Sequence, residues 1–318
     1  MAAVEIRPYD PQRDALPAYA LWQQTLGHLW SLPYDIFHAV TVGNPVYRTG
    51  DHFVALADNE LVGLVATQLH QQTPAPQGHL MFLLVAPTHQ RRGIGRSLHE
   101  QALARLSQRG AAQIQLGGGY YYFWQGVPAN LPAAWPFFQA CGWHEVERSF
   151  DLVRDLADYT TPPHIYARLN PTITIAQATS TDAEAILAFE ARHFPHWLRH
   201  YQNVLNHRGH ADVVLAKDAQ QGIVGASFVL DPRAAWWDYE IRWRSLLGEN
   251  TGGVGPLGVV EPIREQGIGL ALAARVTELL QQRGIQQSYI GWTWLVDWYG
   301  RLGYRVWQAY RMSWRKNP

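Results

Sequence analysis

Two short glycine-containing segments, one in each half of the sequence, are suited to binding a ligand. Gly93-Ile94-Gly95 and Gly267-Ile268-Gly269 each follow a short apolar run and precede a helical pattern. Glycine has no Cβ, so a ligand can come close to the backbone N–H groups. The first turn of a helix leaves N–H groups unpaired at the positive end of its dipole, which favours a phosphate. Because Arg91 and Arg92 adjoin one segment and Arg264 the other, the sequence predicts two phosphate-binding turns.

The residues after the glycines exclude two common nucleotide-binding motifs. A P-loop requires Lys and then Ser or Thr at the start of the helix, whereas Arg96 and Leu270 follow the glycines here. A dinucleotide-binding fingerprint requires a third glycine three positions further on, where the sequence has Leu98 and Leu272. Glycines that serve only helix packing are the alternative, and the recurrence of the pattern argues against it.

The sequence repeats itself well beyond the two glycine segments. Gly267 stands 174 positions after Gly93, and the same offset relates Gln108-Arg109-Gly110 to Gln282-Arg283-Gly284 without a gap. A period this long indicates two copies of one domain rather than a solenoid. A later block recurs at an offset of 161, so the first copy carries 13 extra residues within 118–132, a stretch that contains Tyr120, Tyr121, Tyr122, Phe123 and Trp124.

Hydrophobic patterns predict the same elements in both copies. Short apolar runs indicate buried strands, and apolar residues at helical spacing indicate a helix that ends at a glycine. Two runs that flank Asp58-Asn59 have the pattern of a β-hairpin. Each copy is therefore predicted to be α/β, with a mixed, twisted sheet and flanking helices. The predicted ranges are 53–56, 61–66, 80–85, 94–110 and 114–116 in the first copy, and 213–216, 223–230, 257–260, 268–284 and 288–292 in the second.

The region between the two copies sets the predicted domain boundaries. Residues 158–172 are polar and contain prolines, which is typical of a linker. We therefore expect an N-terminal domain at residues 1–157, a linker at 158–172 and a C-terminal domain at 173–318.

Composition limits the class of protein. The 318 residues are 47% hydrophobic, and Lys+Arg and Asp+Glu both number 26, which excludes a disordered chain and a general nucleic-acid or anionic-membrane binder. The single cysteine, Cys141, excludes an internal disulfide and a cysteine-based zinc site and fits a reducing cytoplasm. The longest apolar run, 80–87, is far shorter than the ~20 residues of a membrane helix, and the first residues lack a signal-peptide pattern. We expect a cytoplasmic protein without a metal site, and the oligomeric state stays open.

The glycine segments and the later blocks resemble motifs of the GNAT superfamily of N-acetyltransferases, over nearly the whole chain. The family's Gln/Arg-x-x-Gly-x-Gly/Ala signature matches residues 90–95 and 264–269, and its aromatic-Tyr-x-x-x-Gly-aromatic block matches 298–304. The resemblance implies two tandem GNAT domains, with the pyrophosphate of acetyl-CoA on the glycine turns and its pantetheine along parallel strands that splay apart. The residues that it assigns to the cofactor are Leu84, Val85, Gln90, Arg91, Arg92, Gly93, Ile94, Gly95 and Arg96 in the first copy, and Leu257, Gly258, Val259, Arg264, Glu265, Gln266, Gly267, Ile268, Gly269 and Leu270 in the second.

The resemblance also implies catalytic residues, and these differ between the copies. In the family, a tyrosine four residues before the glycine of the last block often gives a proton to the leaving thiolate; the second copy has Tyr299 there and the first has Phe138. A base often stands eleven positions before the glycine signature, where the first copy has His79 and the second has Gly253. We therefore expect catalysis in the C-terminal domain with Tyr299 as the acid. A packing tyrosine and a structural histidine are the alternatives, and the base is left open among His79, Glu261, Asp238 and Glu240.

Aromatic residues are frequent near both predicted clefts and suggest the acceptor. Aromatic walls suit cations and the apolar faces of sugar rings, so we expect direct acetyl transfer to a small-molecule amine, such as an amino sugar. A non-catalytic acyl-CoA sensor or scaffold, and a transferase that uses another acyl-CoA, are the alternatives. The aromatic residues concerned are Trp236, Trp237, Trp292, Trp294 and Trp298 in the second copy and the cluster at 120–124 in the first.

Overall fold

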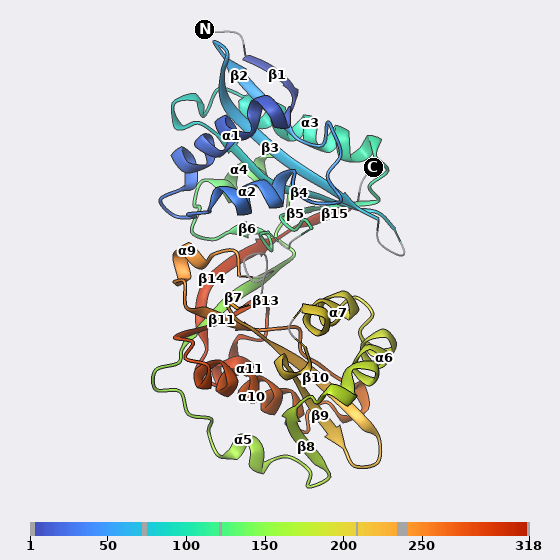
Figure 1. The fold of residues 1–318 in the computed structure, drawn as a ribbon. Coiled ribbons are helices and arrows are strands. Elements are labelled where there is room, and N and C mark those ends of the chain that lie inside the picture. The colour runs from blue at the N-terminus through green and yellow to red at the C-terminus, as the bar shows by residue number, and fades with distance from the viewer. Residues whose placement is uncertain (1–3, 72–74, 121–122, 208, 234–240, 317–318) are drawn as a thin grey trace. The chain divides into compact units, whose positions relative to one another are not determined.

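Two α/β units make up the computed structural model, which describes residues 4–71, 75–120, 123–207, 209–233 and 241–316 (Figure 1). Unit 1 contains residues 1–150 and 308–318, and unit 2 contains residues 151–307. The end of the chain thus belongs to the first unit, although sequence similarity groups it with the second copy. The two predicted α/β copies with mixed sheets and flanking helices are confirmed.

The described part of unit 1 is built on a sheet in the order β1-β2-β3-β4-β5-β15. Neighbouring strands from β1 to β4 are antiparallel, β4 and β5 are parallel, and β15 from the end of the chain pairs antiparallel with β5. The predicted hairpin is confirmed, because Asp58 and Asn59 have φ values of 49° and 65°, as a tight turn between twisted strands requires. The strands are β1 (Val4–Pro8), β2 (Phe53–Ala57), β3 (Glu60–His70), β4 (Gln77–Val85), β5 (Gln113–Leu116), β6 (Val127–Pro128) and β15 (Trp314–Lys316).

Helices pack on both faces of the unit 1 sheet. A Cβ built on Gly63 of β3 would meet Leu98 of α3, so α3 packs closely on that face. On the other face, the ring of Trp22 from α1 lies edge-on to Phe82 of β4, at a centroid distance of 5.4 Å. The helical elements are α1 (Pro11–Leu26), α2 (Tyr34–Thr41), η1 (Pro87–His89), α3 (Ile94–Gln108) and α4 (Ala134–Ala140).

The sheet of unit 2 repeats this arrangement. From β7 it continues in the order β7-β13-β11-β10-β9-β8, with β11 and β13 parallel and β12 paired to β10. The strand that matches β4 is broken here, because β11 ends at Val254 and β12 begins at Gly258. The strands are β7 (Glu147–Asp155) and β14 (Arg305–Met312), which cross the unit boundary, and β8 (Ile173–Gln177), β9 (Val213–Asp218), β10 (Gly222–Leu230), β11 (Thr251–Val254), β12 (Gly258–Val259) and β13 (Gln287–Thr293).

Figure 1 shows α6 and α7 on one side of the unit 2 sheet and α10 and α11 on the other. Within the described ranges, no helix is long and apolar enough to cross a membrane. The predicted linker includes α5, whose preceding and own residues pack on α10: the Thr161 and Tyr166 hydroxyls both donate to Glu278 Oε1, at 2.6 and 2.9 Å. The helical elements are α5 (His164–Ala167), η2 (Ser180–Asp182), α6 (Ala183–His193), α7 (Leu198–His207), η3 (His210–Asp212), α9 (Arg244–Leu247), η4 (Glu261–Ile263), α10 (Ile268–Gln282) and α11 (Val296–Gly300).

Candidate active site

The two glycine turns have the same backbone conformation. Arg91 and Gly93 have φ values of 62° and 87°, and the matching Glu265 and Gly267 have values of 71° and 86°. Left-handed residues in such turns direct successive N–H groups toward one point, which makes a concave anion site at the start of the following helix. The predicted turns therefore both have a geometry suited to a phosphate.

A matching side-chain hydrogen bond fixes each turn to its strand. The Gln90 amide Nε2 donates to the Val85 carbonyl at 3.0 Å, and Arg264 Nε donates to the Val259 carbonyl at the same distance. The first residue of the signature thus has the same structural role in both units. In unit 2 this bond occupies one N–H of the Arg264 guanidinium, and its other N–H groups can face a phosphate.

The parallel strands separate next to both turns. In unit 1 the pairing of β4 with β5 ends at Leu80 and Leu116, whereas β4 continues to Val85. In unit 2 the pairing of β11 with β13 ends at Gly253 and Tyr289. The splay that the family resemblance implies is therefore present in each unit, in front of the glycine turn.

A cavity of about 870 Å³ occupies the splay in unit 1. It is lined by the second half of β4, the glycine turn, the end of β5, α4 and residues of the insertion, and most of these side chains are apolar. The cavity is of the size that small-molecule and cofactor sites usually have. It brings together many of the predicted cofactor residues, namely Leu84, Val85, Gln90, Arg91, Gly93, Gly95 and Arg96.

Aromatic side chains lie against the second glycine of each turn. A Cβ built on Gly95 would lie 3.3 Å from Phe137, and one built on Gly269 would lie 3.1 Å from Trp298. Any larger residue at these positions would therefore crowd the ring. By contrast, a Cβ on Gly93 meets nothing within 4 Å, so the turn is open where a diphosphate would lie.

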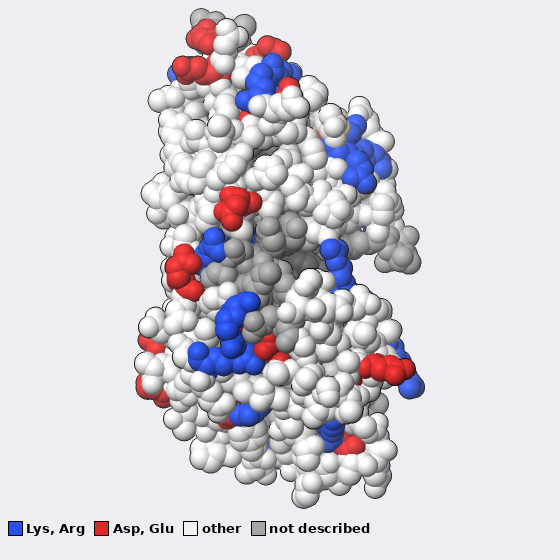
Figure 2. All heavy atoms as spheres, viewed as in Figure 1, with Lys and Arg blue, Asp and Glu red and all other residues white. Residues whose placement is uncertain are grey.

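The charges around the two turns differ strongly. Unit 1 has Arg91, Arg92 and Arg96, all exposed, whereas unit 2 has Glu265, Gln266 and Leu270 at the same places. On the face shown in Figure 2, basic and acidic side chains are otherwise scattered among uncharged ones. The arginines of the first turn thus give it a much more favourable field for a diphosphate than the second turn has.

Arg168 lies beside the turn of unit 2, although it stands 99 positions before Gly267 in the sequence. A Cβ built on Gly267 would be 3.5 Å from the Cβ of Arg168. The Arg168 side chain is exposed. No sequence pattern signals this neighbour, because the folding of segment 158–172 onto α10 alone brings it there.

Tyr299 is buried on α11, and burial raises the pKa of its phenol above the ordinary value, so the hydroxyl stays protonated near neutral pH. Its ring lies 4.7 Å from Trp298 and 6.0 Å from Tyr304, between ring centroids. The matching residue of unit 1, Phe138, lines the cavity of that unit. The repeat predicts the corresponding place for Tyr299, beside the splayed strands of unit 2.

His79 lies on β4 and is buried next to the cavity wall. Its Nδ1 is 3.3 Å from the Gly117 carbonyl, and because a carbonyl only accepts, Nδ1 carries the proton. The Nε2 atom is then a bare lone pair, and it is buried without a hydrogen-bond partner among the described residues. Burial, with a smaller effect of His70, lowers the pKa of His79 to about 3, so the ring is neutral. His79 does not itself line the cavity, although Gly117 does.

The other candidate bases do not come together at the turn of unit 2. Glu261 is exposed on η4, and Gly253 has no side chain to offer. Asp238 and Glu240 lie outside the described residues. A buried glutamate, Glu190, lies on α6 and was not among the predicted bases. Its place next to Phe189, on the apolar face of the helix, is the sequence feature that indicates its burial.

The aromatic residues divide between packing and exposure. Phe123 and Trp124 pack with Trp22 in the core of unit 1, at centroid distances of 5.6 and 5.5 Å. In unit 2 the Trp294 side chain is 71% exposed. Trp292 has a left-handed φ of 56° and its N–H donates to Asp151 Oδ1. Trp236, Trp237, Tyr121 and Tyr122 lie outside the described residues.

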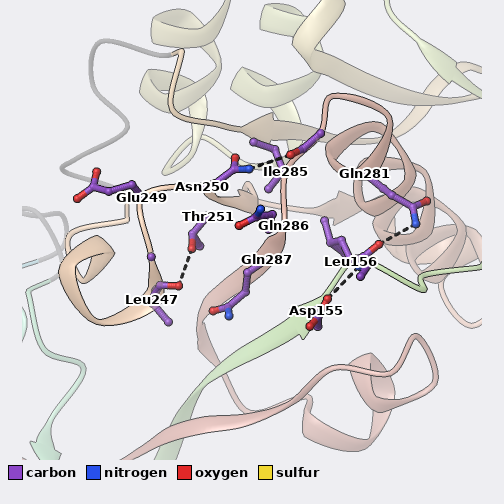
Figure 3. A pocket seen from close by; sticks show the side chains of 13 residues that line it. Asp155, Leu156, Leu247, Glu249, Asn250, Thr251, Gln281, Ile285, Gln286 and Gln287 are labelled. Carbon is purple, nitrogen blue, oxygen red and sulfur yellow. Dashed lines mark hydrogen bonds between the residues drawn. The ribbon is translucent and has the colours of Figure 1, made fainter.

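A second pocket, of about 550 Å³, lies in unit 2 at the start of β11 and β13 (Figure 3). Its polar groups bond to one another: Asn250 Nδ2 donates to the Gly284 carbonyl, and Gln281 Nε2 donates to the Leu156 carbonyl. Because the strands run from this pocket toward the glycine turn, the pocket is at the opposite end of the strands from the predicted site.

Comparisons with known proteins agree with these features. Residues 18–143 match the acetyltransferase (GNAT) family model, and a comparison with curated protein sequences gave no match. Among solved structures, the glucosamine N-acetyltransferase region of a fungal multi-domain GH3 β-N-acetylglucosaminidase is 31% identical, with a TM-score of 0.88. The match covers 99% of this chain, which spans 38% of the fungal protein.

Two further structures have the same fold over the whole chain. A GCN5-related N-acetyltransferase from Sphaerobacter thermophilus is 18% identical with a TM-score of 0.69, and the match covers 99% of this chain and 96% of that one. A tandem GNAT protein from the clavulanic acid biosynthesis pathway is 15% identical with a TM-score of 0.64, with 99% of both chains covered. With its two glycine turns and splayed strands, the chain belongs to the GNAT superfamily and is of the tandem type.

Proposed function

We propose that this protein is an acetyl-CoA-dependent N-acetyltransferase that transfers acetyl directly to the primary amine of a small molecule, with an amino sugar such as glucosamine as the acceptor. The observation that carries the proposal is the pair of matching glycine turns, each placed where parallel strands separate. The similarity to the fungal glucosamine N-acetyltransferase region supports the amino sugar.

The residues of the turns fit the donor in both units. In unit 1 the N–H groups at Gly93 and Gly95 and the guanidinium groups of Arg91, Arg92 and Arg96 would hold the pyrophosphate of acetyl-CoA. The pantetheine amides would pair with the backbone of β4 beyond the point where β5 leaves it. Acetyl-CoA supplies the activated acetyl thioester, and the chain binds and orients it.

In unit 2 the same cradle has fewer charges of its own. We assign the missing positive charge to Arg168, which lies beside Gly267, together with Arg264 at the start of the turn. Two cations would then partly offset Glu265, whose carboxylate repels a diphosphate. The donor would bind less tightly to unit 2 than to unit 1.

Unit 2 would carry out the chemistry. The Tyr299 hydroxyl can give a proton to the leaving sulfur, because its raised pKa keeps it protonated until the thiolate forms. Phe138 offers no proton at the matching place in unit 1. Unit 1 would therefore bind acetyl-CoA without catalysing acetyl transfer. The alternative of a non-catalytic acyl-CoA sensor would then describe unit 1 alone.

The test is an acceptor screen with acetyl-CoA in which free thiol and product mass are measured together. We expect thiol release with glucosamine and a product heavier by one acetyl group. Gly269→Glu should abolish turnover, because the acidic side chain would crowd Trp298 and repel the diphosphate. Gly95→Glu is the matched variant in unit 1 and should leave turnover in place. If acetyl-CoA binds and no amine releases thiol, the proposal fails and a non-catalytic binding role takes its place.

A further inference from the structure

Glu190 is a buried carboxyl group in the interior of unit 2, with the Tyr201 hydroxyl as a neighbouring polar group. Its residue is fully buried on α6, and neither of its two side-chain oxygens has a hydrogen-bond partner among the described residues. Buried polar atoms are nearly always paired, so a carboxyl with two unpaired oxygens needs an explanation. Burial raises the pKa of Glu190 to about 8, and the neighbouring Tyr201 hydroxyl opposes the shift only in part.

The neighbours of Glu190 place it over the break between β11 and β12. Tyr201 of α7 is fully buried beside it and donates its hydroxyl proton to the Pro256 carbonyl, which lies within that break, at 2.9 Å. Phe194 follows Glu190 by one helical turn, and its ring covers Gly258 at the start of β12. Glu190 thus shares its neighbour Tyr201 with the break, and Phe194, at the end of α6, covers Gly258.

This break is the counterpart of a bulge in unit 1. There the pairing of β3 with β4 shifts by one residue between Ala66 and Thr67, which leaves Met81 as the extra residue. Gly255 stands 174 positions after Met81, so both irregularities fall where the parallel strands begin to separate. In unit 1 the helix in the place of α6 is α1, and it presents Trp22 to Phe82 instead of an unpaired carboxyl.

We infer that Glu190 binds the ammonium group of the acceptor and takes a proton from it. The inference rests on the proposed function, because residues 255–258 adjoin the splay in which the thioester would lie. A buried carboxylate is stable only beside a positive charge that also donates hydrogen bonds, and an ammonium group supplies both. A neutral sugar would offer hydroxyl hydrogen bonds without a positive charge, and an anionic acceptor would repel the carboxylate.

The protons of the reaction then balance. Glu190 is protonated near neutral pH before the acceptor binds, because its pKa is about 8, and the bound ammonium group displaces that proton to water. The Glu190 carboxylate then takes one proton from the ammonium group and leaves a neutral amine. The amine nitrogen forms a bond to the thioester carbon, the carbon–sulfur bond breaks, and Tyr299 gives a proton to sulfur. The nitrogen loses a second proton, which restores that of Tyr299, and Glu190 stays protonated as it began, so one acetylamine, one thiol and one proton are formed.

The experiment compares Glu190→Gln with Glu184→Gln, a change at an exposed glutamate of the same helix. For Glu190→Gln we expect kcat/KM for glucosamine to fall by roughly 100-fold or more near pH 7, with unchanged affinity for acetyl-CoA. The deficit should shrink as pH rises past the pKa of the amine, because a neutral amine needs no proton acceptor. A merely structural role would not produce this recovery.

Two outcomes would overturn the inference and leave the proposed function in place. In the first, the wild-type enzyme acetylates glucosamine and the Glu190→Gln variant does so with the same kcat/KM. The other needs no variant: if glucose, which has a hydroxyl in place of the amine, binds the wild-type protein as tightly as glucosamine does, no ammonium group is recognised. A wild-type protein that acetylates no amine would instead refute the proposed function.

Discussion

The two units have the same backbone at the glycine turn and different side chains around it. Both turns have left-handed residues at the same two positions and the same hydrogen bond from the signature's first residue to the strand. Unit 1 surrounds the turn with Arg91, Arg92 and Arg96, whereas unit 2 has Glu265, Gln266 and Leu270 there and buries Tyr299 and Glu190 elsewhere in the unit. The backbone geometry of the turn has thus been retained in both copies, while the charged and ionisable side chains have diverged.

The difference has a physical reason. A strand, a glycine turn and a helix fix the directions of the N–H groups through backbone conformation, which most outward-facing side chains do not affect. Positive charge and proton donors belong to individual side chains, which can change one by one without loss of the fold. A duplicated domain can therefore divide donor affinity and catalysis between its copies.

Tyr299→Phe tests the difference between the units most directly, because it makes unit 2 resemble unit 1 at Phe138. We expect kcat to fall by roughly 10²–10⁴-fold, because no group remains to give the sulfur its proton. Acetyl-CoA affinity, measured by calorimetry, should stay the same because the turn is unchanged. Phe138→Tyr is the matched variant. An unaltered kcat in Tyr299→Phe would remove this hydroxyl from the mechanism.

A second test concerns the stability of unit 2 and its buried carboxyl. The pKa of Glu190 is about 8 in the folded protein and 4.5 as its ordinary value. Between these values the unfolded chain releases a proton that the folded chain keeps, so this residue lowers stability as pH rises from about 5 to 8. The glutamine side chain of the Glu190→Gln variant has no ionisable group, so the variant lacks this pH-dependent loss of stability.

The melting temperature of Glu190→Gln relative to wild type should therefore increase between pH 5 and pH 8, by several degrees if the effect is about 2 kcal/mol. Differential scanning calorimetry at both pH values measures it, with Glu184→Gln as the exposed control. A difference in melting temperature that is the same at both pH values would show that Glu190 is ionised in the folded protein.

A third test removes the charges of the first turn. In a Gly269→Glu background, which leaves only unit 1 for the donor, the double change Arg91→Gln and Arg92→Gln should weaken acetyl-CoA binding by roughly tenfold or more, as expected for lost charge-assisted hydrogen bonds. The loss of affinity caused by the double change should be smaller at high salt. If the double variant binds acetyl-CoA as tightly as its background at both salt concentrations, these arginines do not contact the diphosphate.

The smallest expected effect is at Arg168. In a Gly95→Glu background, Arg168→Gln should weaken acetyl-CoA binding to unit 2 by a few-fold, which is about 1 kcal/mol for one partly exposed contact. Arg305→Gln, at an exposed position on β14, is the control. If both variants bind acetyl-CoA as the background does, Arg168 does not act at the turn and the positive charge of unit 2 comes from Arg264 alone.

Local features of this protein follow from its sequence. Gly110 and Gly284 end their helices with φ values of 81° and 77°, and Asp58-Asn59 turns between two strands, because these conformations depend on only a few neighbouring residues. The repeat offset revealed two copies of one fold, and the glycine spacing revealed both turns. Each of these features is set by periodicity or by backbone freedom at single positions.

Other features were decided only by tertiary structure, because they depend on contacts between distant parts of the chain. Residues 308–318 complete the sheet of unit 1 through the pairing of β15 with β5, which the repeat does not indicate. Arg168 adjoins Gly267 only after segment 158–172 packs on α10. Burial then sets the protonation of ionisable groups: it lowers the pKa of His79 and raises that of Glu190, and a residue's burial is fixed by everything that packs around it.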